Sequence, residues 1–158
     1  MDRTHHLGEP VRIAVATSGD AEAWLELRLA LWPGERREEF AAEIATLLAD
    51  AGETVNLIAR ADDGETMGFA EAALRRDYVE GCQTSPVAFL EGIYVTPDHR
   101  RKGVAAALIR AVENWGRRSG CTEFASDTPI DNIDSQTMHR ALGFEETNRV
   151  VYFRKEIS

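Results

Sequence analysis

The segment FLEGIYVTPDHRRKGVAAA, residues 89–107, contains the features that decide the fold. Its first half is apolar, aromatic and β-branched, which predicts a buried strand over residues 89–95. Thr96-Pro97-Asp98 ends that strand, and three cations, a glycine and a helix-forming run follow. A strand, a basic loop, a glycine and a helix start present backbone N–H groups and the positive end of a helix dipole to a phosphate. The segment therefore predicts a phosphate-binding turn after a central strand.

Working outward from this strand, the apolar spacing predicts alternating helices and strands. Asp63-Gly64 marks a hairpin turn, and a helical stripe runs from Val104 to Trp115. The expected strands span residues 11–16, 55–60, 67–74, 89–95, 121–126 and 150–153. The expected helices run up to residue 31, over 36–50, over 104–118, and over a short stretch before Gly143 that buries Met138, Ala141 and Leu142. Their order gives an α/β class, in the mixed α+β sense, with antiparallel hairpins first and a parallel crossover later. Glu71, inside its strand, indicates that one end of that strand faces water.

Length and composition indicate one soluble domain. We expect residues 1–10 to form a flexible tail and residues 11–158 to form a single domain of ordinary apolar content, 44%. We find no stretch long enough to span a bilayer and no apolar signal-peptide core. Cys82 and Cys121 lack metal-ligand spacing, which fits a metal-free protein in the reduced cytoplasm.

The net charge is -9. An acidic chain is a poor ligand for nucleic acid or for an anionic membrane, because both require Lys and Arg. It suits a polycationic substrate, although the charge can also serve solubility alone.

Several blocks in order resemble one family. They are LWPG at 31–34, RRDYV at 75–79, GC at 81–82, FLEGI at 89–93, ASDT at 125–128 and HRALGFEET at 139–147. Together they resemble the aminoglycoside 6'-N-acetyltransferases of the GNAT superfamily. The resemblance implies acetyl transfer from acetyl-CoA to the 6'-amine of an aminoglycoside, antibiotic resistance, and a homodimer formed through the last strands. It also implies a mostly antiparallel sheet, flanked by helices, that splays between two parallel strands.

The resemblance further implies a binding site for acetyl-CoA. Backbone groups of the central strand would pair with the pantetheine arm, and amides of the Arg100-x-x-Gly103-x-Ala105 pattern would hold the pyrophosphate. The implied cofactor-binding residues are Ile93, Tyr94, Val95, Arg101, Lys102, Gly103, Val104, Ala105, Ala106 and Asn132. The basic run can instead be a solvated turn, and Asn132 can be a helix cap, alone or as well.

Three residues are candidates for catalysis. The resemblance implies that Glu91 binds the substrate ammonium and accepts its proton, and that Asp127 is a second ligand. Glu91 can instead be half of a buried ion pair, and Asp127 an ordinary loop cap. His139 stands where many GNAT enzymes place a tyrosine that protonates the leaving thiolate; it can also be a satisfied surface or interface histidine. A backbone N–H near Tyr94 would stabilise the carbonyl oxygen.

The acceptor site would include Trp32, Glu35, Tyr78 and Asn148 besides Glu91 and Asp127. Trp32 can stack on a sugar ring or belong to the core. Asn148 stands where we expect an acidic contact, so it can change substrate preference. Two other functions stay open: acetylation of another amine, such as a polyamine or a peptide N-terminus, and a non-catalytic acyl-CoA sensor.

Overall fold

The computed structural model describes residues 10–158, and the first nine residues of the expected N-terminal tail lie outside them. The helices are α1 (Ala21–Leu31), α2 (Arg37–Ala49), α3 (Val104–Arg118) and α4 (Ile133–Ala141), with short 3-10 turns η1 (Ser18–Asp20) and η2 (Pro97–His99). The strands are β1 (Val11–Val15), β2 (Thr54–Ala61), β3 (Thr66–Arg75), β4 (Val87–Val95) and β5 (Phe124–Ser126). They form one sheet in the order β1-β2-β3-β4-β5, antiparallel except for the parallel pair β4–β5. The predicted mixed α/β class is confirmed.

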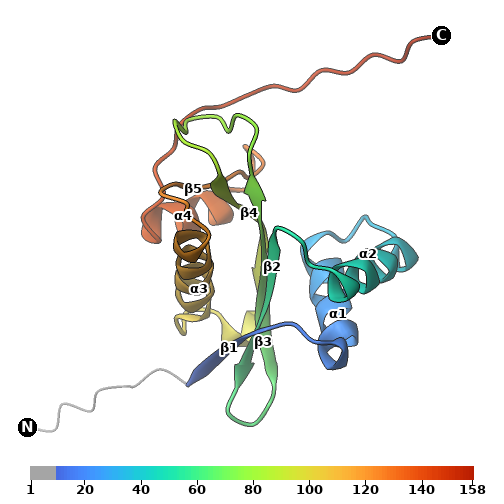
Figure 1. The fold of residues 1–158 in the computed structure, drawn as a ribbon. Helices are drawn as coiled ribbons and strands as arrows, with labels where there is room; N and C mark the ends of the chain where they lie inside the picture. Colours follow the sequence, from blue (N-terminus) through green and yellow to red (C-terminus); the bar gives the residue numbers. More distant parts are fainter. Residues whose placement is uncertain (1–9) are drawn as a thin grey trace, which may run out of the picture.

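Helices cover both faces of this sheet (Figure 1). On one face α3 buries Val104, Leu108 and Val112, the stripe that its sequence period predicted, against apolar side chains of the strands. On the other face α1 and α2 bury a second cluster that includes Trp24 and Ile44. The sheet is thus the middle layer, and its two faces are chemically separate surfaces.

The hairpin between β2 and β3 forms where the sequence predicted it. The Gly64 N–H donates to the Ala61 carbonyl, and Gly64 has a φ of 87°, in the region that favours glycine. This hairpin fixes the register of β3 against β2.

The expected strand over residues 150–153 is not a strand within this chain. Val151, Tyr152 and Phe153 are 77%, 85% and 92% exposed, and the segment runs away from the body in Figure 1. The prediction was wrong because a β-branched and aromatic segment forms a strand only where a neighbouring strand completes its hydrogen bonds.

The buried face predicted for the last helix is also wrong. In α4 no residue is buried: Met138 is half-buried and Ala141 is exposed, while Leu142 just beyond it is half-buried. The helix lies over the short β5, so little sheet is available beneath it.

One end of β3 does face water, at Arg75, but Glu71, on which that expectation was based, is only 6% exposed. Its carboxylate accepts hydrogen bonds from Arg28 Nε at 2.7 Å and from Trp24 Nε1 at 3.0 Å. An ionised side chain in a strand can thus be buried when a helix supplies its partners.

None of the helices in residues 10–158 has the length and apolarity that a bilayer crossing requires.

Candidate active site

The sheet opens between its two parallel strands. β5 pairs with β4 at three positions, Ala88 with Phe124, Phe89 with Ala125, and Leu90 with Ser126. Beyond Leu90, β4 continues to Val95 with β3 as its partner. The predicted splay is therefore present, and it starts one residue after Leu90.

Glu91 sits on a β-bulge at the start of this opening. Glu71 of β3 pairs with Gly92 and Ala72 pairs with Leu90, so Glu91 is an extra residue in β4. Bulges are found next to active sites because they bend a strand and redirect a side chain. The carboxylate is placed by the geometry of the strand and not by a flexible loop.

The partner of Glu91 is an arginine that sequence reasoning missed. Arg75 Nη2 lies 3.0 and 3.1 Å from the two carboxylate oxygens, and the guanidinium lies 3.5 Å from the centroid of the Phe89 ring. The side chains of Arg75 and Glu91 are 44% and 38% exposed. Glu91 is in an ion pair, as one interpretation of the sequence held, but the pair is open to solvent.

The strand alternation identifies the backbone groups that face the opening. The Thr96 N–H donates to the Met67 carbonyl of β3 at 2.9 Å. Because N–H groups alternate in direction along a strand, the N–H of Tyr94 also points to β3. The N–H groups of Ile93 and Val95 point to the opposite edge of β4, where β5 no longer pairs with it. The Val95 carbonyl accepts a hydrogen bond from Arg100 Nε at 2.9 Å.

The turn after β4 has the conformation expected of an anion site. Gly103, with a φ of 81°, precedes α3, and Arg101 also has a positive φ, 62°. A Cβ built on Gly103 would meet nothing within 4 Å, so a ligand can approach the backbone there. The N–H groups of the first turn, from Val104 to Ala106, point out of the helix toward this space.

Asn132 has the capping role that the sequence allowed. Its Oδ1 accepts the Ser135 N–H at 3.0 Å at the start of α4. A contact with a cofactor remains a prediction.

Asp127 and His139 lie at the end of β5. Asp127 is exposed and follows Ser126, so it leaves the sheet at the same level as Glu91. His139 of α4 is half-buried, and its Nε2 lies 2.8 Å from Ser126 Oγ. Its Nδ1 lies 2.7 Å from the Ser135 carbonyl oxygen. His139 is therefore held by hydrogen bonds at both ring nitrogens, and its catalytic role remains a prediction.

Trp32 joins the core to the site. Its ring is half-buried against Phe40 and Phe69, with centroids 5.8 and 6.3 Å apart. It also covers Gly92, where an added Cβ would lie 2.7 Å from the ring. Trp32 thus packs in the core and reaches the residue beside Glu91.

The other three predicted acceptor residues are exposed and stand apart. Glu35 lies in the turn before α2, and Tyr78, 77% exposed, lies in the loop before β4. Asn148 donates a hydrogen bond to Glu80 at 2.9 Å. Within residues 10–158 no hydrogen bond or ion pair joins any of them to Glu91, so their roles remain predictions.

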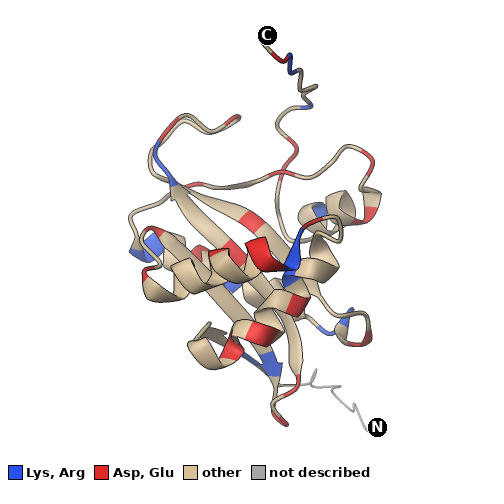
Figure 2. Cartoon of the chain, turned by 90° about the vertical axis from the view of Figure 1, so that its right-hand side faces the viewer, with Lys and Arg blue, Asp and Glu red and all other residues tan. Residues whose placement is uncertain are grey.

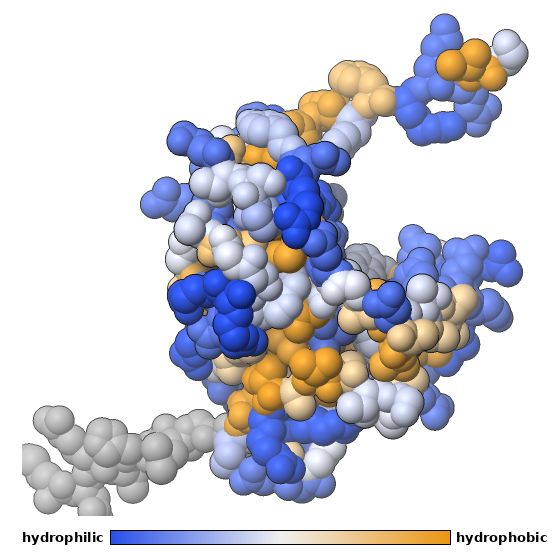
Figure 3. Space-filling model, in the orientation of Figure 1, coloured by the Kyte–Doolittle hydropathy of each residue, from blue (hydrophilic) through white to orange (hydrophobic). Residues whose placement is uncertain are grey.

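A hollow lies between α1 and α2, on the side of the sheet that carries Glu71. It runs along α2, measures about 450 Å³ and is lined by Arg28, Ala42, Glu43, Thr46 and Leu47. Figure 3 shows the surface hollowed beside α2, and Figure 2 shows acidic residues on the side of α1 and α2. A cationic acceptor would meet a negative surface on this face.

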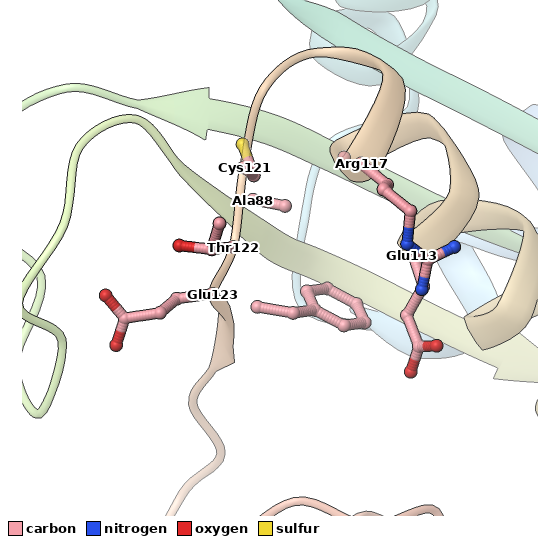
Figure 4. A pocket seen from close by; sticks show the side chains of 8 residues that line it. Ala88, Glu113, Arg117, Cys121, Thr122 and Glu123 are labelled. Carbon is pink, nitrogen blue, oxygen red and sulfur yellow. The ribbon is translucent and has the colours of Figure 1, made fainter.

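A second cavity lies outside this site, between the C-terminal end of α3 and the segment that leads into β5. It measures about 310 Å³, and its lining includes Ala88, Arg117, Cys121 and Glu123 (Figure 4). Burial raises the pKa of the Cys121 thiol, and burial together with Glu123 raises that of Cys82. Neither sulfur is therefore an activated thiolate.

The residues that sequence reasoning missed are Arg75, the buried pair Arg28–Glu71, and Ser126. Ser126 and Arg75 were both inside quoted motif blocks, so a signal existed for them. For Arg28 there was no sequence signal beyond its place on α1, because its partner Glu71 is 43 residues away in the chain.

Comparisons with known proteins agree with this geometry. The model of the acetyltransferase (GNAT) family matches residues 21–144. The aminoglycoside N(6')-acetyltransferase type 1 of Serratia marcescens is 51% identical over 145 residues, which cover 92% of this chain and 99% of that protein. The structure of AAC(6')-Iy with CoA has a TM-score of 0.89 at 46% identity and covers 96% of this chain and 99% of that one. AAC(6')-Iy with the bisubstrate analog CoA-S-monomethyl-acetylneamine has a TM-score of 0.88 at 47% identity, over 94% and 99% of the two chains. The chain belongs to the GNAT acetyltransferase family.

Proposed function

We propose that the protein is an aminoglycoside 6'-N-acetyltransferase that transfers the acetyl group of acetyl-CoA to the 6'-amine and so confers antibiotic resistance. One observation carries the proposal: an accessible carboxylate, Glu91, stands on a bulge where β4 and β5 part. The relatives support the substrate class, because they carry this name over nearly the whole chain.

The residues present fit acetyl-CoA. The turn at Gly103 is open to a phosphate, and the backbone of Arg101 to Ala106 borders it. Next to it the backbone groups of Ile93 and Val95 face the gap beside β5, where an extended pantetheine arm can pair as another strand would. Lys102 would add charge at the pyrophosphate, and Asn132 would meet the arm from the start of α4.

The acceptor would enter from the face of α1 and α2. Glu91 and Asp127 would bind its ammonium groups where the two strands part, and Trp32 would offer its exposed edge to a sugar ring. Glu35, Tyr78 and Asn148 would contact outer parts of the acceptor from the surrounding turns. Aminoglycosides are polycations, which the net charge of -9 would attract.

An amine must be neutral to attack a thioester, and the amines of such substrates are protonated near neutral pH. Glu91 would take the proton, directly or through water. Arg75 Nη2 donates hydrogen bonds to both carboxylate oxygens of Glu91, and the substrate ammonium would compete with it for these oxygens. The N–H of Ile93 or Val95, which flank Tyr94, would stabilise the carbonyl oxygen as negative charge develops. The attack is direct, within a ternary complex.

We also propose that residues 11–158 form one domain of a cytoplasmic homodimer. Val151, Tyr152 and Phe153 form an exposed apolar segment of high β-propensity, and such segments mark interfaces. A second copy of the chain would supply the strand neighbour that this segment lacks. The free thiols Cys82 and Cys121 fit a reducing compartment. Sedimentation velocity of the wild type and of Val151→Lys/Phe153→Lys tests the dimer: we expect a dimer and a monomer, respectively.

Release of CoA in the presence of kanamycin or tobramycin tests the activity. We expect turnover with both and none with an aminoglycoside that has a 6'-hydroxyl, because the 6'-amine is the nucleophile. Turnover with polyamines or peptides in place of aminoglycosides would overturn the substrate class. Binding of acetyl-CoA without turnover of any amine would favour the sensor.

A further inference from the structure

Ser126 is the last residue of β5 that pairs with β4, and it is hydrogen-bonded to His139. The Oγ atom lies 2.8 Å from His139 Nε2, and His139 Nδ1 lies 2.7 Å from the Ser135 carbonyl oxygen. The edge of the imidazole packs on the Phe144 ring, with centroids 5.2 Å apart. A serine hydroxyl is therefore oriented by a fixed imidazole at the point where the sheet opens.

This pair lies on the face of the sheet opposite to Glu91. Ser126 is paired with Leu90, whose side chain packs with α3 in the cluster that contains Val104 and Leu108. Paired residues of neighbouring strands project to the same face, so Ser126 faces α3 and α4. Glu91 bonds to Arg75, which shares the opposite face with Glu71, four residues away on β3. A proton acceptor and a proton donor thus stand on the two sides of one opening.

The hydrogen bonds of His139 serve two protonation states without any movement. In the imidazolium, Nδ1–H donates to the Ser135 carbonyl and Nε2–H donates to Ser126 Oγ. In the neutral ring, Nδ1–H keeps its carbonyl and Nε2 accepts the Ser126 O–H. In both states the carbonyl holds a proton on Nδ1, and the mobile proton lies between Nε2 and Oγ.

We propose that Ser126 is a catalytic residue that protonates the departing sulfur of CoA, and that His139 positions it and replaces its proton. The proposal rests on the proposed function, since it assigns the second proton transfer of that reaction. When the C–S bond breaks, its electron pair stays on sulfur. The sulfur takes the Ser126 hydroxyl proton, Oγ takes the Nε2 proton, and His139 becomes neutral and later regains a proton from solvent. Glu91 accepts the proton of the substrate amine on the other face of the sheet.

The test measures kcat and KM for acetyl-CoA and for kanamycin in Ser126→Ala, His139→Gln and the double variant. General acid–base groups contribute 10²–10⁴-fold, so we expect each single variant to lose about 10²-fold in kcat with both KM values within about 3-fold. Because the two residues act in one relay, the double variant should be no worse than the poorer single variant. Ser126→Thr, which keeps a hydroxyl, should retain most of the rate.

Thr137→Ala is the matched control on α4, since its hydroxyl bonds only within the helix, to the Ile133 carbonyl. Losses that multiply in the double variant, a loss carried by KM, or an unchanged kcat in Ser126→Ala would each overturn the relay. A wild type that releases no CoA with kanamycin would instead overturn the proposed function. Circular dichroism and thermal unfolding of each variant separate a folding defect from a chemical one.

Discussion

Two arginine–glutamate pairs lie on one face of the sheet, and they differ in burial. Arg28–Glu71 is sealed under α1, with side chains 6% and 8% exposed. Arg75–Glu91, at the adjoining bulge, has side chains 44% and 38% exposed. A buried pair is fixed because either partner alone would be a desolvated charge. An exposed pair contributes little stability, so its members can exchange partners. The same chemistry therefore serves structure under α1 and, in the proposed function, substrate binding at the opening.

Breaking the buried pair should have the largest effect. Arg28→Met leaves Glu71 buried without its guanidinium, and loss of one partner of a buried pair costs about 3–5 kcal/mol. Urea unfolding followed by tryptophan fluorescence measures this loss. Arg75→Met is the matched variant on the open pair and should change the free energy of unfolding by less than about 1 kcal/mol. Equal losses in the two variants would contradict the comparison.

Removing the open carboxylate should affect activity and leave stability nearly unchanged. We expect Glu91→Gln to lower kcat/KM for kanamycin by about 10²-fold or more, because the base is lost, with an unfolding free energy within about 1 kcal/mol of wild type. Asp127→Asn should give a smaller loss, carried mainly by KM for the acceptor. Glu53→Gln, which breaks the exposed pair with Arg76 just after β3, is the control and should change neither activity nor stability. Full activity in Glu91→Gln would remove its assigned role.

Residues that repeat with a regular period were predicted well from the sequence. The stripe of α3, the hairpin at Gly64 and the strand before Pro97 all depend on local spacing, and all are present. The bulge at Glu91 depends instead on how many residues of β3 oppose β4, which local spacing does not contain. For the same reason the pairing of Glu71 with Arg28 was missed.

The C-terminal segment shows a second limit. Tyr152 and Phe153 have high β-propensity, yet propensity indicates only that a residue suits a strand and does not supply the neighbour. In the site, sequence blocks suggested Glu91, Asp127 and His139 as candidates, but the opposite faces of Glu91 and Ser126 follow only from the register of β4 and β5. The face of the sheet to which a side chain points depends on how its strand pairs with the neighbouring strands.

A methyl group added to Gly92 should disturb the strand between the two pairs, because Gly92 lies opposite Glu71 and next to Glu91. In Gly92→Ala the new Cβ would lie 2.7 Å from the Trp32 ring and 3.1 Å from the Leu31 side chain. Overpacking of this kind costs about 1–3 kcal/mol, and displacement of Trp32 should raise KM for the acceptor more than KM for acetyl-CoA. Gly34→Ala, where nothing lies within 4 Å, is the control for both measurements. An unchanged free energy of unfolding in Gly92→Ala would mean that the Trp32 ring can move aside without loss of stability.

The pair Arg60–Asp20 has intermediate burial, with side chains 31% and 16% exposed, and should give the smallest effect. Burial raises the pKa of Asp20, but hydrogen bonds from the Thr17 N–H and from Arg60 outweigh it, so the folded-state pKa lies below the usual value. A carboxylate with a lowered pKa stabilises the fold above its unfolded pKa, about 3.9, and the contribution is lost as the pH falls through the folded value. Asp20→Asn should therefore be less stable than wild type by up to about 1 kcal/mol at pH 6. Urea unfolding from pH 6 down to 3 should show the difference shrinking below pH ~4. A difference that stays constant over this range would mean that Asp20 acts through the shape of its side chain and not through its charge.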